Sequence, residues 1–215
     1  TPNDRTRLGV TAPGLESFLA RPGRWRGLRL GLVTTPSAVT RDLRHAVLAL
    51  RAVRGLRLAA LFAPQHGVWA HAQDWVEVED ARDPATGLPV HSLYGQTRRP
   101  TRDMLEGVDA LLFDVQDVGA RYYTFIYTML HAMEACAAHG RRLIVLDRPN
   151  PLGGAGVDGN VLAPAFSSFV GLHPLATRHG LTVGELALLF RKERGLNVEH
   201  KVVRMRGWRR DMAFE

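Results

Sequence analysis

The sequence is poor in cysteine and has no long apolar run. Cys136 is the single cysteine among 215 residues, so the chain can form no internal disulfide and offers no thiolate metal cluster. No stretch approaches the roughly 20 apolar residues of a membrane span, and the polar segment from Thr1 to Arg7 does not resemble a signal peptide. We therefore predict a globular chain with no membrane span, in which Cys136 is a small buried side chain. Oligomeric state and cellular compartment stay open.

Lysine is almost absent as well, because Lys192 and Lys201 are the only two lysines behind a formal net charge of +7. The arginines that carry this charge are scattered, whereas a nucleic-acid-binding surface gathers them on one face. The densest group comprises Arg204, Arg206, Arg209 and Arg210. We predict no nucleic-acid partner and take the preference for arginine over lysine as a sign of a biased genome.

One segment, from Asp109 to Met129, joins a strand to a helix through a polar turn. The apolar run Ala110–Val115 is typical of a strand buried on both faces. From Ile126 onward, apolar residues recur at the three-and-four spacing of a helix that hides one side. Ligands in open α/β sheets bind at the carboxyl ends of strands. The candidate site residues of this turn are Asp114, Asp117, Arg121, Tyr122 and Tyr123.

A purely structural role is the alternative for this turn. Asp114 or Asp117 would then cap the helix, and Arg121 would pair with one of them. Capping uses one carboxylate and leaves the other unexplained, which favours a functional role for the group. We predict that Asp114 is the residue needed for chemistry, because it follows the strand directly and is held by it. Asp117 is expected to cap the helix or to orient Arg121.

Strand and helix patterns alternate along the rest of the chain. We expect strands at 28–35, 57–63, 90–94, 142–147 and 198–205, and helices at 42–53, 102–106 and 182–195. Leu43, Val47 and Leu50 would face inward from the first helix, and Thr182 with Glu185 forms a capping box at the start of the last. Residues 68–89 are expected to be a loop, either a solvated surface loop or a sugar-binding rim. The alternation predicts an α/β fold with a doubly wound, mostly parallel sheet.

Polar residues follow several of these strands, so one crevice could collect them. They are Thr34, Thr35, Gln65, His66, Asp114, Asp117, Asp147, Arg148 and Asn150. His179 lies beside the start of a helix, where a cationic histidine is disfavoured; it is either a neutral hydrogen-bonding group or a structural residue. The glycine-rich stretch up to Gly159 is no dinucleotide fingerprint, because no helix opens from it. We therefore predict no nucleotide or other cofactor and no metal.

Several of these motifs also carry a family resemblance, in one order over nearly the whole chain. They are Pro64-Gln-His-Gly67, Thr86-Gly-Leu-Pro-Val-His-Ser-Leu-Tyr-Gly95, Phe113-Asp-Val-Gln-Asp-Val-Gly-Ala-Arg-Tyr-Tyr-Thr124, Val145-Leu-Asp-Arg-Pro-Asn-Pro-Leu-Gly-Gly154 and Arg178-His-Gly-Leu-Thr-Val-Gly-Glu-Leu-Ala187. The sequence resembles the exo-β-N-acetylmuramidases of the NamZ type. The resemblance implies a Rossmann-like N-terminal domain, expected at 1–195, and a smaller C-terminal domain that is largely absent, with 196–215 as its start.

The resemblance also implies a function, the release of N-acetylmuramic acid from the non-reducing end of peptidoglycan fragments in cell-wall turnover. The active site would lie in the cleft between the two domains, and the partner would be a muropeptide or a saccharide of N-acetylmuramic acid and N-acetylglucosamine. The expected catalytic residues are Asp114, Gln65, His66 and Asp117. The expected substrate-binding residues are Arg121, Tyr122, Tyr123, Arg148, Asn150 and His179, with Arg148 or Arg121 holding the lactyl carboxylate.

One departure from the family concerns Gln65, which occupies a position where the family usually has glutamate and where its proposed acid or base maps. Glutamine cannot exchange a proton in the relevant pH range, so either another carboxylate does that work or the protein is weakly active or inactive. Two alternatives remain. The chain is a non-catalytic muropeptide-binding module that keeps the cleft, or it is an unrelated nucleotide-binding Rossmann domain.

Overall fold

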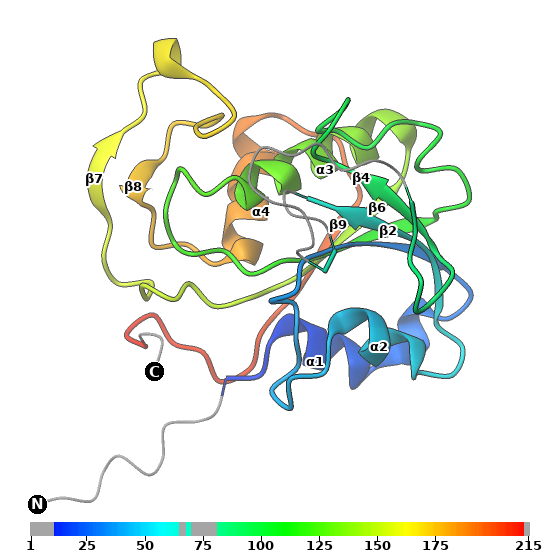
Figure 1. Cartoon of the computed structure of the whole chain (residues 1–215). Helices are drawn as coiled ribbons and strands as arrows, with labels where there is room; N and C mark the ends of the chain where they lie inside the picture. The colour runs from blue at the N-terminus through cyan, green and yellow to red at the C-terminus, as the bar shows by residue number, and fades with distance from the viewer. Residues whose placement is uncertain (1–10, 65–67, 70–80, 213–215) are drawn as a thin grey trace, which may run out of the picture.

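The computed structural model describes residues 11–64, 68–69 and 81–212 of the chain. Their main feature is a seven-stranded sheet with the order β3-β4-β2-β1-β5-β6-β9 (Figure 1). Its strands are β1 (Arg29–Thr34), β2 (Arg57–Ala63), β3 (Ala81–Arg82), β4 (Pro89–Ser92), β5 (Ala110–Asp114), β6 (Arg142–Leu146) and β9 (His200–Val203). Only the pairing of β3 with β4 is antiparallel, so the predicted mostly parallel sheet is confirmed.

The sheet reverses its winding direction between β1 and β5. From β1 the chain moves outward through β2 to β4, and it then returns to β5 on the other side of β1 and continues to β6 and β9. The carboxyl ends of the two central strands lie in register, with Thr34 opposite Asp114. Such a reversal is the topological switch point at which open α/β sheets bind their ligands.

Helices cover both faces of the sheet, as a doubly wound fold requires. In Figure 1, α1 (Gly14–Leu19) and α2 (Ala46–Arg51) lie on one side, and α3 (Phe125–His139) and α4 (Val183–Glu193) lie on the other. Two separate apolar cores result, one under each pair of helices. Two short 3₁₀ helices, η2 (Pro22–Trp25) and η3 (Pro164–Phe166), complete the helical elements of the described residues.

The helix α3 is buried along most of its length, which explains its apolar sequence. Cys136 lies inside this helix as a free, buried thiol, and burial raises its pKa to about 12. At the start of α4, the Thr182 side chain accepts a hydrogen bond from the Glu185 backbone while the Glu185 side chain accepts one from the Thr182 backbone. The predicted burial of the cysteine and the predicted capping box are both confirmed.

Two helix predictions need correction. Residues 102–106 form turns and no helix. The helix expected at 42–53 begins only at Ala46, after the N-cap His45, because Leu43 adopts a left-handed conformation with φ 59° that interrupts helical geometry. Leu43 is 79% exposed instead of facing inward, whereas Val47 and Leu50 are buried as predicted.

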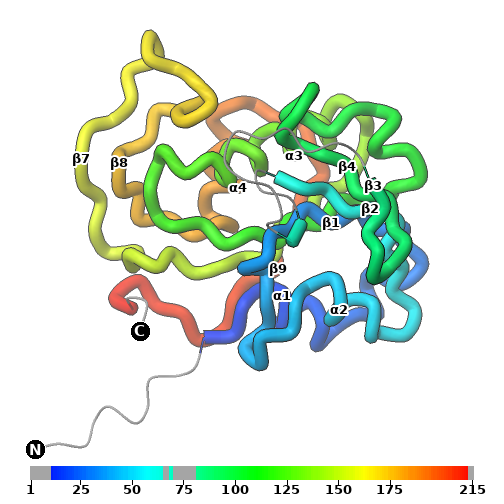
Figure 2. The backbone as a smooth tube through the Cα atoms, viewed as in Figure 1, coloured from blue at the N-terminus to red at the C-terminus, as the bar shows by residue number. Residues whose placement is uncertain are grey.

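A two-stranded antiparallel sheet stands beside the main body, and the sequence did not predict it. It consists of β7 (Asp158–Val161) and β8 (Ala176–Arg178) with the connection that carries η3, and Figure 2 shows it as a separate arm. All four residues of β7 are exposed, so the strand lacks the apolar alternation by which strands are recognised. We call residues 158–178 the arm.

The last strand, β9, lies beyond residue 195, where the sequence predicted the start of a second domain. It pairs in parallel with β6 and forms an edge of the main sheet. A further backbone bridge joins Arg206 to Ala12, so the red and dark blue segments of Figure 2 run side by side. Residues 200–206 are therefore built into the main sheet and its surroundings, and where a second domain begins stays a prediction.

Candidate active site

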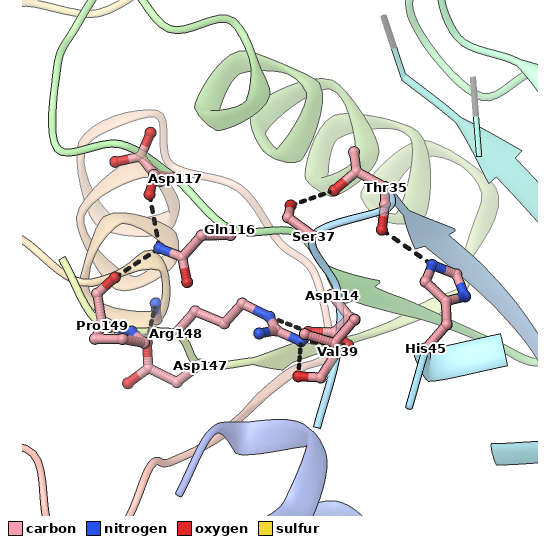
Figure 3. Close-up of polar contacts among 11 residues, drawn as sticks. Thr35, Ser37, Val39, His45, Asp114, Gln116, Asp117, Asp147, Arg148 and Pro149 are labelled. Carbon is pink, nitrogen blue, oxygen red and sulfur yellow. Dashed lines mark hydrogen bonds and ion pairs between the residues drawn. The ribbon is translucent and has the colours of Figure 1, made fainter. Parts of the chain in front are cut away.

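The candidate site lies at the switch point, where polar residues of the loops after β1, β5 and β6 meet (Figure 3). Thr34 and Asp114 end the two central strands, and both are fully buried. The Thr34 hydroxyl has no hydrogen-bond partner among the described residues. The predicted gathering of strand-end residues is therefore observed for the loops that the structure describes.

A buried ion pair joins the ends of β5 and β6. The Arg148 guanidinium donates from Nε to Asp114 Oδ1 at 2.6 Å and from Nη2 to Asp114 Oδ2 at 3.1 Å. The side chains of Arg148 and Asp114 are 4% and 0% exposed. Two-point contacts of this kind are strong and directional. Both oxygens of Asp114 are thus already occupied by donors of the protein.

Arg148 is also held by the loop after β1, because its Nη2 donates to the Val39 carbonyl oxygen at 3.2 Å. Figure 3 shows Val39 beside the ion pair. The remaining nitrogen, Nη1, donates to no described residue. The guanidinium is therefore fixed on one side and keeps two N–H groups for another acceptor.

Asp117 has a different environment, in which only one carboxylate oxygen is used. Its Oδ2 accepts the Gly119 N–H at 2.8 Å and lies 3.2 Å from His179 Nε2. Its Oδ1 is buried and has no hydrogen-bond partner among the described residues. A buried polar atom without a partner costs about 1–3 kcal/mol and calls for an explanation, of which a functional role is one.

The hydrogen bonds of His179 define its tautomer. Nδ1 accepts the Leu181 N–H at 3.2 Å, so the ring proton is on Nε2 and points at Asp117. The imidazole side chain is 1% exposed. His179 therefore donates a hydrogen bond through its Nε2–H to the Asp117 carboxylate.

Amide side chains tie the loop after β5 to the turn after β6 and hold that turn in shape. Gln116 Nε2 donates to the carbonyl oxygens of Asp117 and Pro149, at 2.6 and 2.8 Å (Figure 3). Asn150 donates to the Leu181 carbonyl at 3.0 Å and accepts the Leu152 N–H at 2.9 Å. Its side-chain oxygen leaves no room for a Cβ at position 119, where φ is +83° and glycine is required.

Asn150 was predicted to bind substrate, but its amide is buried and committed to the backbone. We therefore describe it as a residue that shapes the turn, and a direct contact with substrate stays a prediction.

The expected roles of Asp117 and Arg121 in the turn are wrong. Asp117 does not cap α3, whose N-cap is Thr124 without a side-chain cap bond. Arg121 does not pair with either aspartate; its Nη1 donates to the carbonyl oxygens of Asn160 and Leu175 at 2.6 and 2.7 Å. Arg121 thus fastens the arm to the main domain, and its backbone N–H also bonds Thr177.

The two tyrosines of the same turn differ in exposure. Tyr122 is 60% exposed and is free to contact a ligand. Tyr123 is half-buried and packs edge-on against Phe125 at 4.7 Å between ring centres. Burial, and then the nearby charge of Asp117, raise the pKa of Tyr123, which places its hydroxyl in the electrostatic field of that carboxylate.

Asp147 contacts the start of the helix that follows His179. Its Oδ1 accepts the Gly184 N–H at 2.7 Å, so a strand end is joined to the first turn of α4. Burial raises the pKa of Asp147. Because α4 follows His179 directly, this contact fixes where the histidine stands relative to β6.

Sequence reasoning missed a second polar cluster beside the site. His45 lies 3.0 Å through Nε2 from the Thr35 carbonyl and accepts the Val47 N–H through Nδ1. Its ring packs on Trp69 at 4.5 Å between centroids, and the Trp69 indole donates to Asp83 at 2.7 Å. A histidine N-cap resembles no common capping signature, so the sequence carries no signal for it.

Two predicted catalytic residues, Gln65 and His66, lie outside the described residues. The described part of the chain brings together Asp114, Asp117, Arg148, Asn150 and His179, and it directs Arg121 away toward the arm. Within those same residues, no group of three or more His, Cys, Asp or Glu side chains could hold a metal ion. No helix there is long and apolar enough to cross a membrane.

Comparison with known proteins gives concordant matches. The family model described as exo-beta-N-acetylmuramidase NamZ, N-terminal, matches residues 30–215. The peptidoglycan beta-N-acetylmuramidase NamZ of Bacillus subtilis (strain 168) is 49% identical over 190 residues, which are 88% of this chain and 46% of that protein.

Two solved structures of DUF1343 family proteins from Bacteroides fragilis NCTC 9343 share the fold. The first has a TM-score of 0.87 and 41% identity, over 94% of this chain and 52% of that one. The second has a TM-score of 0.82 and 29% identity, over 96% and 55%. The chain spans about half the length of the relatives it matches. It belongs to the NamZ exo-β-N-acetylmuramidase family and matches the N-terminal part of that family.

Proposed function

We propose that the full-length protein is a glycoside hydrolase that releases N-acetylmuramic acid from the non-reducing end of peptidoglycan fragments. The observation that carries this proposal is the 49% identity to a peptidoglycan β-N-acetylmuramidase over 88% of the chain. The polar cluster at the switch point supports it, because that is where this class of sheet binds ligands. The chain supplies one wall of the site.

Glycoside hydrolysis usually needs two carboxyl groups and passes through a transition state with positive charge on the sugar ring. Asp114 was predicted to be one of them, and that stays a prediction. The geometry favours Asp117 instead, because both Asp114 oxygens accept bonds from Arg148, whereas Asp117 Oδ1 accepts none from any described residue. We assign Asp117 to the reacting sugar, where an ionised carboxylate stabilises the developing charge or activates water.

In this assignment, His179 is a positioning residue. Its Nε2–H and the Gly119 N–H both reach Asp117 Oδ2, so they hold the carboxylate plane and direct Oδ1 away from them. A carboxylate that is oriented in advance loses less free energy when the transition state forms. Gln116 also helps to hold Asp117 in place, because its side-chain N–H donates to the Asp117 carbonyl oxygen.

Arg148 is the better of the two arginines for the lactyl carboxylate of N-acetylmuramic acid. Its Nη1 is uncommitted among the described residues, while its other nitrogens are fixed by Asp114 and Val39. Arg121 Nη1 instead donates to two carbonyl oxygens of the arm. A fixed guanidinium recognises a planar carboxylate with little loss of side-chain entropy.

A non-catalytic muropeptide-binding module is the second candidate, and Gln65 is the observation that favours it. An amide at that position cannot act as an acid or base. The two candidates share the Arg148 contact and differ in whether Asp117 takes part in turnover.

The test uses the full-length protein with a chromogenic N-acetylmuramide and the matching N-acetylglucosaminide, which lacks the lactyl group. The proposal predicts cleavage of the first and little or none of the second. Arg148→Lys, which loses the planar fork but keeps the charge, should raise KM for the muramide. Binding without cleavage would support the module, and preference for the glucosaminide would contradict both candidates.

A further inference from the structure

A groove lined by charged and apolar residues opens on the face of the sheet that α1 and α2 cover. It has a volume of about 690 Å³ and lies between α1, the loop after β1 and the segment after β9. Its lining residues are Glu16, Leu19, Ala20, Thr40, Arg41, Asp42, Arg44 and Arg206. Thr40 is the direct neighbour of Val39, whose carbonyl holds Arg148. One lining residue is therefore next in sequence to the residue whose carbonyl oxygen holds the arginine of the site.

A strained turn builds one wall of this groove. Leu43 has φ 59°, a left-handed conformation that costs a residue other than glycine roughly 1–2 kcal/mol. Thr40 holds the turn closed, because its N–H donates to the Arg44 carbonyl at 3.0 Å and its hydroxyl oxygen accepts the Arg44 N–H at 3.1 Å. Strain of this kind persists where the surroundings enforce it and is concentrated at functional sites.

The charges of the groove are only partly matched. Arg41 is paired with Glu16 at 2.8 Å, and Asp42 accepts the Thr40 hydroxyl at 2.5 Å in the field of Arg44 and Arg41. Arg44 and Arg206 are exposed and donate side-chain hydrogen bonds to no described residue. The groove thus contains three arginines and two carboxylates. The guanidinium groups of Arg44 and Arg206 donate to no described residue, so their N–H groups can bind a ligand.

We propose that this groove binds a carboxylate of the glycan substrate beyond the reacting sugar, through Arg44 and Arg206. The inference rests on the proposed function. Two parts of peptidoglycan beyond the reacting sugar supply such a carboxylate: the free lactyl group of the next muramic acid along the chain, or a stem peptide attached to that second muramic acid. Arg148 binds the reacting sugar, and the groove binds the part of the substrate beyond that sugar. Free guanidinium groups are the side chains best suited to a carboxylate.

The experiment compares four saccharides in the full-length protein and in the double variant Arg44→Ala with Arg206→Ala. They are N-acetylmuramic acid alone, the disaccharide with N-acetylglucosamine, a tetrasaccharide with two free lactyl groups, and the same tetrasaccharide with a stem peptide on its second muramic acid. Dissociation constants come from calorimetry in the Asp117→Asn background, or in the wild type if it does not turn over. Binding is thus measured even if the proposed hydrolysis fails.

The double variant should weaken binding of the tetrasaccharide, of the stem-bearing tetrasaccharide or of both by at least about fivefold, roughly the effect of two exposed charge contacts. Which of the two weakens identifies the source of the carboxylate. The monosaccharide and plain disaccharide should bind as before. Asp42→Asn should tighten binding of the affected ligand, because the substitution removes a charge that repels the carboxylate. Added NaCl should weaken that binding by screening the charges.

Arg51→Ala is the matched control, since Arg51 is an exposed arginine at the end of α2 that does not line the groove. Thermal unfolding of each variant checks that the strained turn survives the substitution. Unchanged binding of all four saccharides in the double variant, or equal weakening of all four, would overturn the proposal. So would the same loss in Arg51→Ala.

Discussion

The buried pair of Asp114 and Arg148 leads to a sharp prediction about stability. Asp114→Asn removes the charge from a side chain that is 0% exposed and leaves the Arg148 guanidinium, 4% exposed, without its counter-ion. Breaking a buried ion pair on one side costs about 3–5 kcal/mol, because the remaining charge is neither solvated nor compensated. For a chain of this size, each kcal/mol lowers Tm by about 2–4 °C. We expect Asp114→Asn to lower Tm by roughly 6–20 °C.

Asp117→Asn should lower the stability of the protein less than Asp114→Asn does. One of its oxygens has no partner among the described residues, and an asparagine oxygen can still accept the bonds from His179 and Gly119. We expect a loss of about 1–2 kcal/mol, the size of a weakened charge-assisted hydrogen bond. Asp103→Asn, at an exposed position, is the control and should stay within about 0.5 kcal/mol of the wild type.

The assay is thermal and urea unfolding of the full-length protein, followed by circular dichroism at neutral pH. A second variant with Asp114→Leu and Arg148→Met removes both charges and should recover much of the stability lost in Asp114→Asn, since replacing a whole buried pair by apolar groups is often neutral. An Asp114→Asn protein that unfolds within about 2 °C of the wild type, while Asp117→Asn unfolds far earlier, would refute this reasoning.

Three further predictions concern the scaffold. Cys136 should not react with a thiol reagent in the folded protein near pH 8 and should react fully in urea, because burial raises its pKa to about 12; fast native labelling would contradict this. Thr182→Ala should lower stability by about 1 kcal/mol through loss of the capping box, whereas Thr182→Ser should not. Burial lowers the pKa of His45 below its ordinary 6.5, so its contribution to stability is present above that pH and lost as pH falls through the folded value. His45→Gln should therefore flatten the acid side of a plot of Tm against pH, and an unchanged plot would speak against a buried neutral ring.

Much of the fold can be predicted from the sequence because its strands are continuous apolar runs. Residues 57–63 form β2 as predicted, and 110–115 and 142–147 form β5 and β6 to within one residue. The arm could not be predicted, because β7 is exposed and is defined by its pairing with β8, in which Asp158 lies opposite Arg178 and Val161 opposite Ala176. The start of α2 was misjudged because the residues before it form a turn, held by hydrogen bonds between Thr40 and Arg44, in which Leu43 takes a left-handed conformation.

The membership of the site was easier to predict than the roles within it. Strand-end position alone identified Asp114, Asp117 and Arg148, and parallel strands bring such ends together. That β5 and β6 are neighbours was the available signal that Asp114 and Arg148 would pair. The role of Arg121 had no such signal, since its partners are main-chain carbonyls of the arm. The orientation of His179 likewise depends on a backbone N–H.

The assignment of Asp117 to the reacting sugar is tested by the turnover of a chromogenic N-acetylmuramide by full-length Asp117→Asn and His179→Gln, with folding of each variant verified by its Tm. We predict that Asp117→Asn lowers kcat by at least the roughly 10²-fold typical of a lost acid–base or electrostatic group. His179→Gln, which can still donate to Asp117 Oδ2, should lower kcat less and leave KM nearly unchanged. A folded Asp117→Asn protein with wild-type kcat would contradict the assignment, and an inactive Asp114→Asn protein with wild-type Tm would return the catalytic role to Asp114.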